Sequence, residues 1–284
     1  MKNNVFVVGA GTMGSGIAQA AAEHAMTTML FDTMPGAVDK GLKAIARSLD
    51  KRIEKGELDE KTKGAILARN APAATLEEAC SAAFVIEAVK EDLDIKRGVF
   101  GELDRICGPH TILGTNTSAL RISDIATAAA HPERVIGIHF FNPAARMPLI
   151  EVVPGAATSA ATVDAVRLFA AALEKNAVVV RESPGFVLNR ILIPMINEAI
   201  CALDQGVADR AGIDTVMKFG ANHPMGPLAL ADLIGLDVVL SVMENLEKGL
   251  GDQKYRPSPL LRRMVAEGRL GRKTGRGFYE YPRK

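Results

Sequence analysis

The chain has 284 residues, of which 48% are hydrophobic and 24% are charged, and its formal net charge is +1. This length predicts one large or two medium-sized domains of an ordinary globular protein. The near-zero charge argues against a nucleic-acid partner or a membrane surface, and no apolar run approaches the roughly 18 residues of a membrane helix.

The first predicted strand, Val5–Val8, leads directly into a glycine-rich turn with the sequence Gly9-Ala-Gly11-Thr12-Met13-Gly14. Gly9 permits a tight turn from strand to helix, Gly11 lets the backbone approach a pyrophosphate, and Gly14 lets the helix pack closely on the strand. The N–H groups and the positive dipole end at the start of the following helix favour phosphate. This turn therefore predicts a dinucleotide-binding site.

The second predicted strand, Thr28–Phe31, ends in Asp32, about twenty residues beyond the turn. A carboxylate at this distance accepts hydrogen bonds from both hydroxyls of an adenosine ribose and repels a 2′-phosphate. The next residue, Thr33, supplies no cation that could receive such a phosphate. We therefore expect NAD as the cofactor, in preference to NADP.

A long insert over about residues 35–70 follows. Its apolar residues recur at intervals of three and four and predict an amphipathic helix: Leu42, Ile45, Leu49 and Ile53. A second helix is expected to begin at Leu58-Asp59-Glu60, which gives a helical hairpin that leaves the sheet. This arm is either an elaboration for packing or a substrate-binding surface.

The strands that follow alternate with helices, as in a parallel sheet with helices on both faces. Predicted segments are the strands Phe84–Val89 and Thr111–Thr115, the strand-like runs RVIGIHFF (134–141) and PLIEVV (148–153) with Pro143 between them, the helix Ala160–Glu174 and the strand Ala177–Val180. The break at Ser183-Pro184-Gly185 separates a Rossmann-type domain, residues 1–184, from a second domain, residues 185–284. The second domain is predicted to be all-helical, with helices over Phe186–Leu203, Asp214–Phe219, Leu228–Leu246 and Pro259–Glu267.

His139 and Glu151 are ionisable residues in two apolar runs where neither is expected. If the two runs form a hairpin that is symmetric about Ala145, His139 lies opposite Glu151. The carboxylate would then fix the imidazole tautomer and favour its protonated form, which suits a base that removes the proton of an alcohol during hydride transfer. A buried structural ion pair is the alternative.

The segment Gly114-Thr-Asn116-Thr-Ser118-Ala-Leu120 follows a predicted parallel strand. Ligands of open α/β sheets bind at the carboxyl ends of their strands, so Asn116 and Ser118 are candidates to face nicotinamide and substrate. A helix N-cap is an equally good interpretation of these residues.

Cys80, Cys107 and Cys201 are scattered and show no CxxC spacing, which indicates reduced thiols. The five histidines form neither HExxH nor another metal-ligand spacing, so we expect no metal site. The first strand begins at Val5, which leaves no room for a signal or transit peptide. We expect a cytoplasmic protein.

Taken in order, several motifs resemble the L-3-hydroxyacyl-CoA dehydrogenase family, with bacterial 3-hydroxybutyryl-CoA dehydrogenases as the most similar type. The resemblance covers essentially the whole chain. Besides the glycine turn, Asp32, Asn116-Thr-Ser118 and the segment from His139 to Glu151, the matching motifs are Pro184-Gly185-Phe186-Val-Leu-Asn189-Arg190, Pro224-Met225-Gly226-Pro227 with Asp232, and Lys273-Thr274-Gly275-Arg-Gly277-Phe278-Tyr279.

The resemblance implies residue roles. His139 would be the catalytic base and Glu151 its partner, while Ser118 and Asn189 would contact the reacting oxygen of the substrate. The residues that would line the cofactor cleft are Glu91, Lys96, Asn116, Asn142 and Lys273. The family also contacts coenzyme A through a serine and a lysine of the helical arm, which match Ser48 and Lys55.

The residues of the arm agree with that implication, because Ser48, Lys51, Arg52 and Lys55 recur at helical spacing on one polar, cationic face. A solvated charged face is the ordinary interpretation of such a stripe. With the resemblance, the arm indicates a site for the phosphates of an acyl carrier.

We therefore expect an NAD-dependent dehydrogenase of lipid metabolism that interconverts short-chain (S)-3-hydroxyacyl-CoA and 3-ketoacyl-CoA. The resemblance also implies a homodimer formed through the second domain. Two alternatives are a hydroxyacid dehydrogenase that does not use thioesters, and a non-catalytic nucleotide sensor. The cationic arm argues against the first, and the complete candidate site argues against the second.

Overall fold

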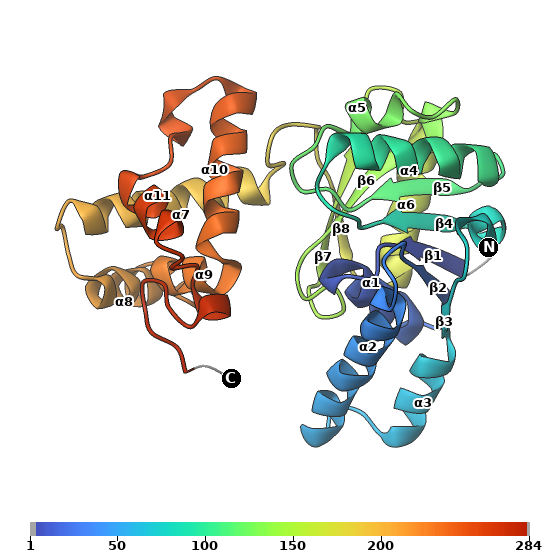
Figure 1. Cartoon of the computed structure of the whole chain (residues 1–284), viewed down its shortest axis with the longest axis horizontal. Helices are drawn as coiled ribbons and strands as arrows, with labels where there is room; N and C mark the ends of the chain where they lie inside the picture. Colours follow the sequence, from blue (N-terminus) through green and yellow to red (C-terminus); the bar gives the residue numbers. More distant parts are fainter. Residues whose placement is uncertain (1–3, 283–284) are drawn as a thin grey trace. The chain divides into compact units, whose positions relative to one another are not determined.

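The structure, a computed structural model, describes residues 4–282, and the chain divides between residues 182 and 183 into two compact units (Figure 1). Each unit encloses its own cluster of buried apolar side chains.

The first unit is built on one eight-stranded sheet with the strand order β3-β2-β1-β4-β5-β6-β7-β8. The strands are β1 Asn4–Val8, β2 Thr27–Phe31, β3 Asn70–Pro72, β4 Phe84–Glu87, β5 Ile112–Thr115, β6 Val135–Phe140, β7 Leu149–Pro154 and β8 Asn176–Val179. Strands β1 to β6 are parallel, whereas β7 is antiparallel to β6 and parallel to β8. The carboxyl ends of β1 to β6 therefore meet at one edge, and the strand order reverses between β1 and β4, where ligands of such sheets bind.

Helices cover both faces of this sheet, which confirms the predicted fold class. Helix α1 (Thr12–Glu23) connects β1 to β2, and α4 (Leu93–Ile106) connects β4 to β5 in the opposite direction along the sheet. Because parallel crossovers are right-handed, the two helices lie on opposite faces. Helix α6 (Ala160–Ala172) shares the buried core of α1, while the short helix α5 (Ile122–Ala126) packs against α4.

The predicted helical arm is present between β2 and β3. It consists of α2 (Ala37–Glu54) and α3 (Glu60–Ala68), which lie side by side in Figure 1. Asp59 caps α3, because its side chain accepts a hydrogen bond from the backbone N–H of Thr62 at 2.7 Å. Ile45, Leu49 and Ile66 are buried in the core shared with α1, so the apolar face of the arm packs on the domain. The short strand β3 that follows was not predicted.

The second unit is built of helices, as predicted. Its longer helices are α7 (Leu188–Asp204), α8 (Arg210–Gly220), α9 (Pro227–Ile234), α10 (Leu236–Leu250) and α11 (Pro259–Ala266). Ile196, Leu236, Met243 and Leu261 are fully buried in its core.

One helix prediction is wrong: the segment Leu228–Leu246 forms two helices rather than one. The chain leaves α9 at Gly235, whose φ of +105° is incompatible with a right-handed helix and is rarely adopted by residues with a side chain. The apolar pattern continues across this break because both helices contribute to the same core.

Candidate active site

The three glycines after β1 differ in what a side chain at each position would meet. Gly9 has a φ of +102°, and a Cβ atom there would lie 2.6 Å from the backbone oxygen of Ala88. A Cβ atom on Gly14 would lie 1.7 Å from the backbone oxygen of Gly9, so only glycine allows α1 to start this close to β1. A Cβ atom on Gly11 would meet no described atom within 4 Å. This open side, at the start of α1, fits a pyrophosphate that approaches the backbone.

Asp32 joins the turns that follow β1 and β2. Its Oδ2 accepts a hydrogen bond from the N–H of Ala10 at 2.7 Å, and its Oδ1 accepts one from the N–H of Met34 at 2.9 Å. The carboxylate is thus held at the carboxyl edge beside the glycine turn, and half-buried. This placement fits the ribose-binding acid of a dinucleotide site.

His139 on β6 lies directly opposite Glu151 on β7, which confirms the hairpin register that symmetry about Ala145 predicts. The Nδ1 atom of His139 lies 2.8 Å from Oε2 of Glu151, and both side chains are at least nine-tenths buried. The Phe141 ring packs edge-on against the imidazole, with ring centroids 4.6 Å apart. A buried carboxylate on Nδ1 fixes the orientation of the ring, so its other nitrogen, Nε2, is the one suited to a substrate proton.

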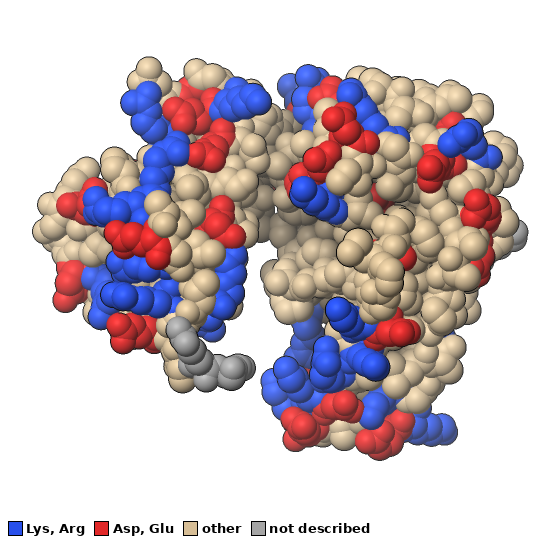
Figure 2. Space-filling model, in the orientation of Figure 1, with Lys and Arg blue, Asp and Glu red and all other residues tan. Residues whose placement is uncertain are grey.

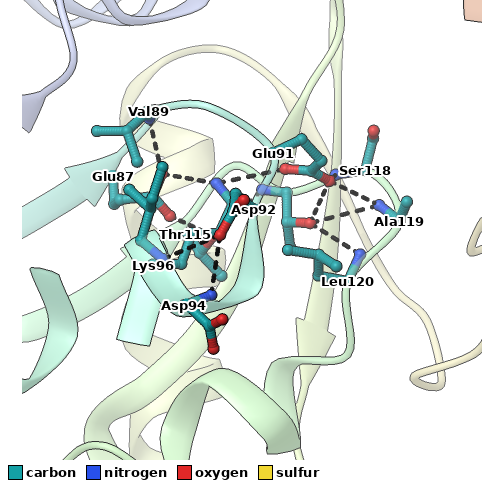
Figure 3. Close-up of polar contacts among 12 residues, drawn as sticks. Glu87, Val89, Glu91, Asp92, Asp94, Lys96, Thr115, Ser118, Ala119 and Leu120 are labelled. Atoms are coloured by element: carbon teal, nitrogen blue, oxygen red, sulfur yellow. Dashed lines mark hydrogen bonds and ion pairs between the residues drawn. The ribbon is translucent and has the colours of Figure 1, made fainter. Parts of the chain in front are cut away.

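The loop after β5 carries Asn116 and Ser118. The Oδ1 atom of Asn116 accepts a hydrogen bond at 2.8 Å from the backbone N–H of Phe140, the residue after His139. The backbone N–H of Ser118 donates to Oε1 of Glu91 at 3.0 Å, and its side chain points away from Glu91 in Figure 3. The structure therefore brings this loop, Glu91 and the His139 strand to the same edge of the sheet.

Lys96 is almost completely buried, with 1% of its side chain exposed. Its ammonium group lies 2.7 Å from Oε1 of Glu87 and 3.3 Å from Oε2 of Glu91 (Figure 3). Glu87, a residue that sequence analysis did not single out, thus neutralises the buried charge of Lys96. The same signal that marked Glu151, a carboxylate in an apolar strand, could have marked Glu87.

The helical arm carries a cluster of cationic side chains, and Figure 2 shows Lys and Arg gathered over it. Lys51 and Lys55 are exposed, whereas Ser48 and Arg52 are half-buried. Arg52 is engaged by Glu23, 2.8 Å away, so it belongs to the packing of α2 on α1. The exposed cations of the predicted face are therefore Lys51 and Lys55.

An ion pair at the tip of the arm was also missed by sequence analysis. Arg146, in the loop between β6 and β7, lies 2.6 Å from Glu57, in the turn between α2 and α3. Arg146 is the main reason that the pKa of Glu57 is lowered, through a hydrogen bond and charge, with smaller contributions from Lys55 and Arg52.

Asn189 and Lys273 belong to the second unit. Asn189 lies in the first turn of α7, and Lys273 lies in the short 3₁₀ helix Arg272–Thr274, where it is ion-paired with Asp237. Asp232 organises this segment, because its buried carboxylate accepts hydrogen bonds from the N–H groups of Phe278 and Tyr279. Burial raises the pKa of Asp232, although these hydrogen bonds oppose the shift.

Within residues 4–282, no group of three or more His, Cys, Asp or Glu side chains is placed to hold a metal ion. No helix in that range is long and apolar enough to span a membrane.

Comparison with known proteins gives matches over both units. The family model "3-hydroxyacyl-CoA dehydrogenase, NAD binding domain" matches residues 4–183, and the model "3-hydroxyacyl-CoA dehydrogenase, C-terminal domain" matches residues 185–281. The chain is 52% identical over 280 residues to the probable 3-hydroxybutyryl-CoA dehydrogenase of Bacillus subtilis, covering 99% of this chain and 98% of that protein. It is 49% identical to the 3-hydroxybutyryl-CoA dehydrogenase of Clostridioides difficile, with 97% and 98% covered.

A solved structure is similarly close. The crystal structure of (S)-3-hydroxybutyryl-CoA dehydrogenase from Ralstonia eutropha matches with a TM-score of 0.95 and 46% sequence identity, and the match covers 100% of both chains.

Proposed function

Because the chain belongs to the 3-hydroxyacyl-CoA dehydrogenase family, whose first domain binds NAD, we propose that it oxidises (S)-3-hydroxybutyryl-CoA to acetoacetyl-CoA reversibly. Short-chain 3-hydroxyacyl-CoA thioesters are the substrate class, and lipid metabolism is the setting. The observation that carries the proposal is the buried pair of His139 and Glu151, 2.8 Å apart, at the sheet edge where the glycine turn lies.

In this mechanism His139 is the general base. Its Nε2 atom receives the proton of the C3 hydroxyl, while Glu151, on Nδ1, stabilises the charge that the imidazole gains. NAD⁺, when bound, would supply the acceptor for the hydride that leaves C3. In the reverse direction His139 returns the proton to the carbonyl oxygen.

The remaining site residues are assigned by the resemblance. Ser118 and Asn189 hydrogen-bond the reacting oxygen. The cofactor is contacted by Gly9, Gly11, Thr12, Met13, Gly14, Asp32, Glu91, Asn116, Asn142 and Lys273. Lys96 contributes through Glu91, since its ammonium group is buried against Glu87 and Glu91. Ser48, Lys51 and Lys55 hold the nucleotide end of coenzyme A, supported by the exposure of both lysines.

The test is a spectrophotometric assay that follows NADH oxidation with acetoacetyl-CoA. Turnover with the thioester and none with free acetoacetate supports the proposal. Equal activity with the free acid would favour a hydroxyacid dehydrogenase, and NADH binding without turnover would favour a nucleotide sensor.

The proposal includes a homodimer in the cytoplasm. Helix α8 exposes 65% of Val216 and 81% of Phe219, which are three residues apart and so share a face that a second copy of this chain would cover. The three cysteines are free thiols, as is usual in a reducing compartment.

A further inference from the structure

A closed ring of polar contacts joins the loop after β4 to the loop after β5 (Figure 3). Thr115 Oγ1 donates to Glu87 Oε2 at 2.7 Å and accepts from the N–H of Thr117 at 3.2 Å. Thr117 Oγ1 donates to Glu91 Oε1 at 2.5 Å. Lys96 closes the ring, because its Nζ lies 3.3 Å from Glu91 Oε2 and 2.7 Å from Glu87 Oε1. We call these five residues the polar ring.

Most of the polar ring is inaccessible to solvent. The side chains of Glu87 and Lys96 are 0% and 1% exposed, and Glu91 is the corner that reaches the surface, with 38% exposed. Glu87 accepts three hydrogen bonds, from Lys96, from Thr115 and from the backbone N–H of Val89. These partners hold the Glu87 carboxylate in one position, because any displacement would leave a charged group unpaired in the interior.

The surface corner of the polar ring holds the backbone of the loop that carries Ser118. Glu91 Oε1 accepts from the N–H groups of Ser118 and Ala119 at 3.0 and 3.1 Å. On its other side the loop is held by Asn116, which accepts from the N–H of Phe140 beside His139. The polar ring therefore determines where Ser118 lies relative to the strand of His139.

We propose that Glu87 is a positioning residue for hydride transfer: paired with Lys96, it acts through the polar ring to hold Ser118 against the reacting oxygen, and Glu87 itself touches neither substrate nor NAD. This inference rests on the proposed function. A buried ion pair adds little stability compared with a well-packed apolar pair of the same size, so stability alone does not account for these charges. The need to position a catalytic group accounts for these charges, because an error of about 1 Å in its position costs roughly 10²-fold in rate.

The first test separates the positioning role from stability by comparing a variant that lacks one charge of the pair with a variant that lacks both. Lys96→Met leaves Glu87 buried without its cation and is expected to melt at a lower temperature than the wild type. The double variant Glu87→Gln/Lys96→Met removes both charges and is expected to regain most of that melting temperature. Its kcat with acetoacetyl-CoA, measured at saturating NADH, should nevertheless stay about 10- to 100-fold below wild type. A kcat that recovers together with the melting temperature would overturn the inference.

The second test keeps both charges and breaks the ring at a neutral member. Thr115→Val removes the hydroxyl that bridges Glu87 to Thr117, whereas Thr115→Ser keeps it. We expect kcat to fall about tenfold or more in the first variant and to remain within about 2-fold in the second. Equal kcat values for Val and Ser would contradict the role of the ring.

The matched control is another buried ion pair of the same unit, Arg134 with Asp104, which lies where β6 begins. Arg134→Met should lower the melting temperature without changing kcat per folded molecule. Wild-type turnover of acetoacetyl-CoA is measured in parallel. An inactive wild type would refute the proposed function and this inference with it, whereas an active wild type with fully active ring variants would refute this inference alone.

Discussion

Three carboxylates near the carboxyl edge of the sheet have different hydrogen-bond partners, and these partners indicate their roles. Asp32 accepts two backbone N–H groups, Glu151 contacts an imidazole, and Glu87 contacts an ammonium group. A carboxylate held only by neutral backbone donors keeps its negative charge for a ligand, whereas one paired with a cation is already neutralised. Asp32 is therefore the acid suited to a ribose.

At the residue scale, His139→Gln should lower kcat about 10²- to 10⁴-fold, the usual contribution of a positioned general base. The Kd for NADH should hardly change, because the imidazole acts on the substrate oxygen. Glu151→Gln should cause much of the same loss, since an amide does not stabilise an imidazolium charge. Steady-state kinetics and fluorescence titration with NADH check both variants, and near-normal turnover in either one refutes its assigned role.

Asp32 also predicts the nucleotide preference. A 2′-phosphate beside this carboxylate would be repelled and would leave ribose hydrogen bonds unmade, so kcat/KM should favour NADH over NADPH by roughly tenfold or more. Asp32→Asn removes the charge and should narrow the ratio. Thr33→Ser, at the neighbouring exposed position, is the control that should leave it unchanged, and a wild type that prefers NADPH would contradict the assignment.

At the scale of elements, two ion pairs join segments that are distant in the sequence. Glu57 in the arm contacts Arg146 of the β6–β7 loop, and Asp104 on α4 contacts Arg134, the residue before β6. The first pair is largely exposed to solvent, whereas the second is buried. Exposed pairs contribute about 0–1 kcal/mol, so only the second is expected to matter for stability.

Lys55→Ala tests the arm as a site for coenzyme A. Losing this exposed cation should raise the KM for acetoacetyl-CoA several-fold, and the effect should shrink as salt concentration rises. The KM for NADH and the activity toward a truncated thioester without the nucleotide should stay nearly unchanged. Lys61→Ala, an exposed lysine on α3, is the matched control. Equal impairment with and without the nucleotide would mean that the arm only supports the fold.

The ionisation of Asp104 makes the free energy of unfolding depend on pH. Burial alone would raise the pKa of Asp104, but hydrogen bonds from Arg134 and from the N–H of Ala130 outweigh it, so the pKa is lowered. The stability from this carboxylate is therefore present above its unfolded pKa of about 3.9 and is lost as the pH falls through the lower folded value.

Asp104→Asn should cost about 3 kcal/mol at pH 7, because it leaves Arg134 buried beside an uncharged partner. The difference from wild type should shrink toward pH 3. Urea unfolding at pH 7, 4 and 3 measures it, with Asp164→Asn, an exposed acid on α6, as the control. A difference that is equal at all three pH values would contradict the linkage.

At the scale of the whole molecule, the proposed dimer is tested at Val216 and Phe219, two exposed apolar residues of α8 in the second unit. The wild type should elute with twice the mass of the 30.2 kDa chain in size-exclusion chromatography with light scattering. Phe219→Glu should shift it toward the monomer, because it places a charge in an apolar interface. Leu168→Glu, an exposed leucine of the first unit, should not. A monomeric wild type would refute the dimer.

Much of this architecture was predictable because its signals are local. The glycine turn is set by backbone conformation and close approach, which only glycine allows, and the His139–Glu151 register follows from one short hairpin. The polar ring was not predicted, because Glu87 meets Thr115 through the pairing of two parallel strands 28 residues apart. The pairing of Arg52 with Glu23 likewise depends on how α2 packs on α1.

The hairpin of β6 and β7 keeps the proposed base and its partner only twelve positions apart, in one continuous segment. Asp32, on which the expected nucleotide preference depends, lies elsewhere, where it joins the turns after β1 and β2. Because the two sites are distant in the sequence, we expect substitutions that change the cofactor preference to leave the proton chemistry of His139 and Glu151 unchanged. A library of variants confined to the turn after β2 would vary the cofactor preference and leave His139 and Glu151 unchanged.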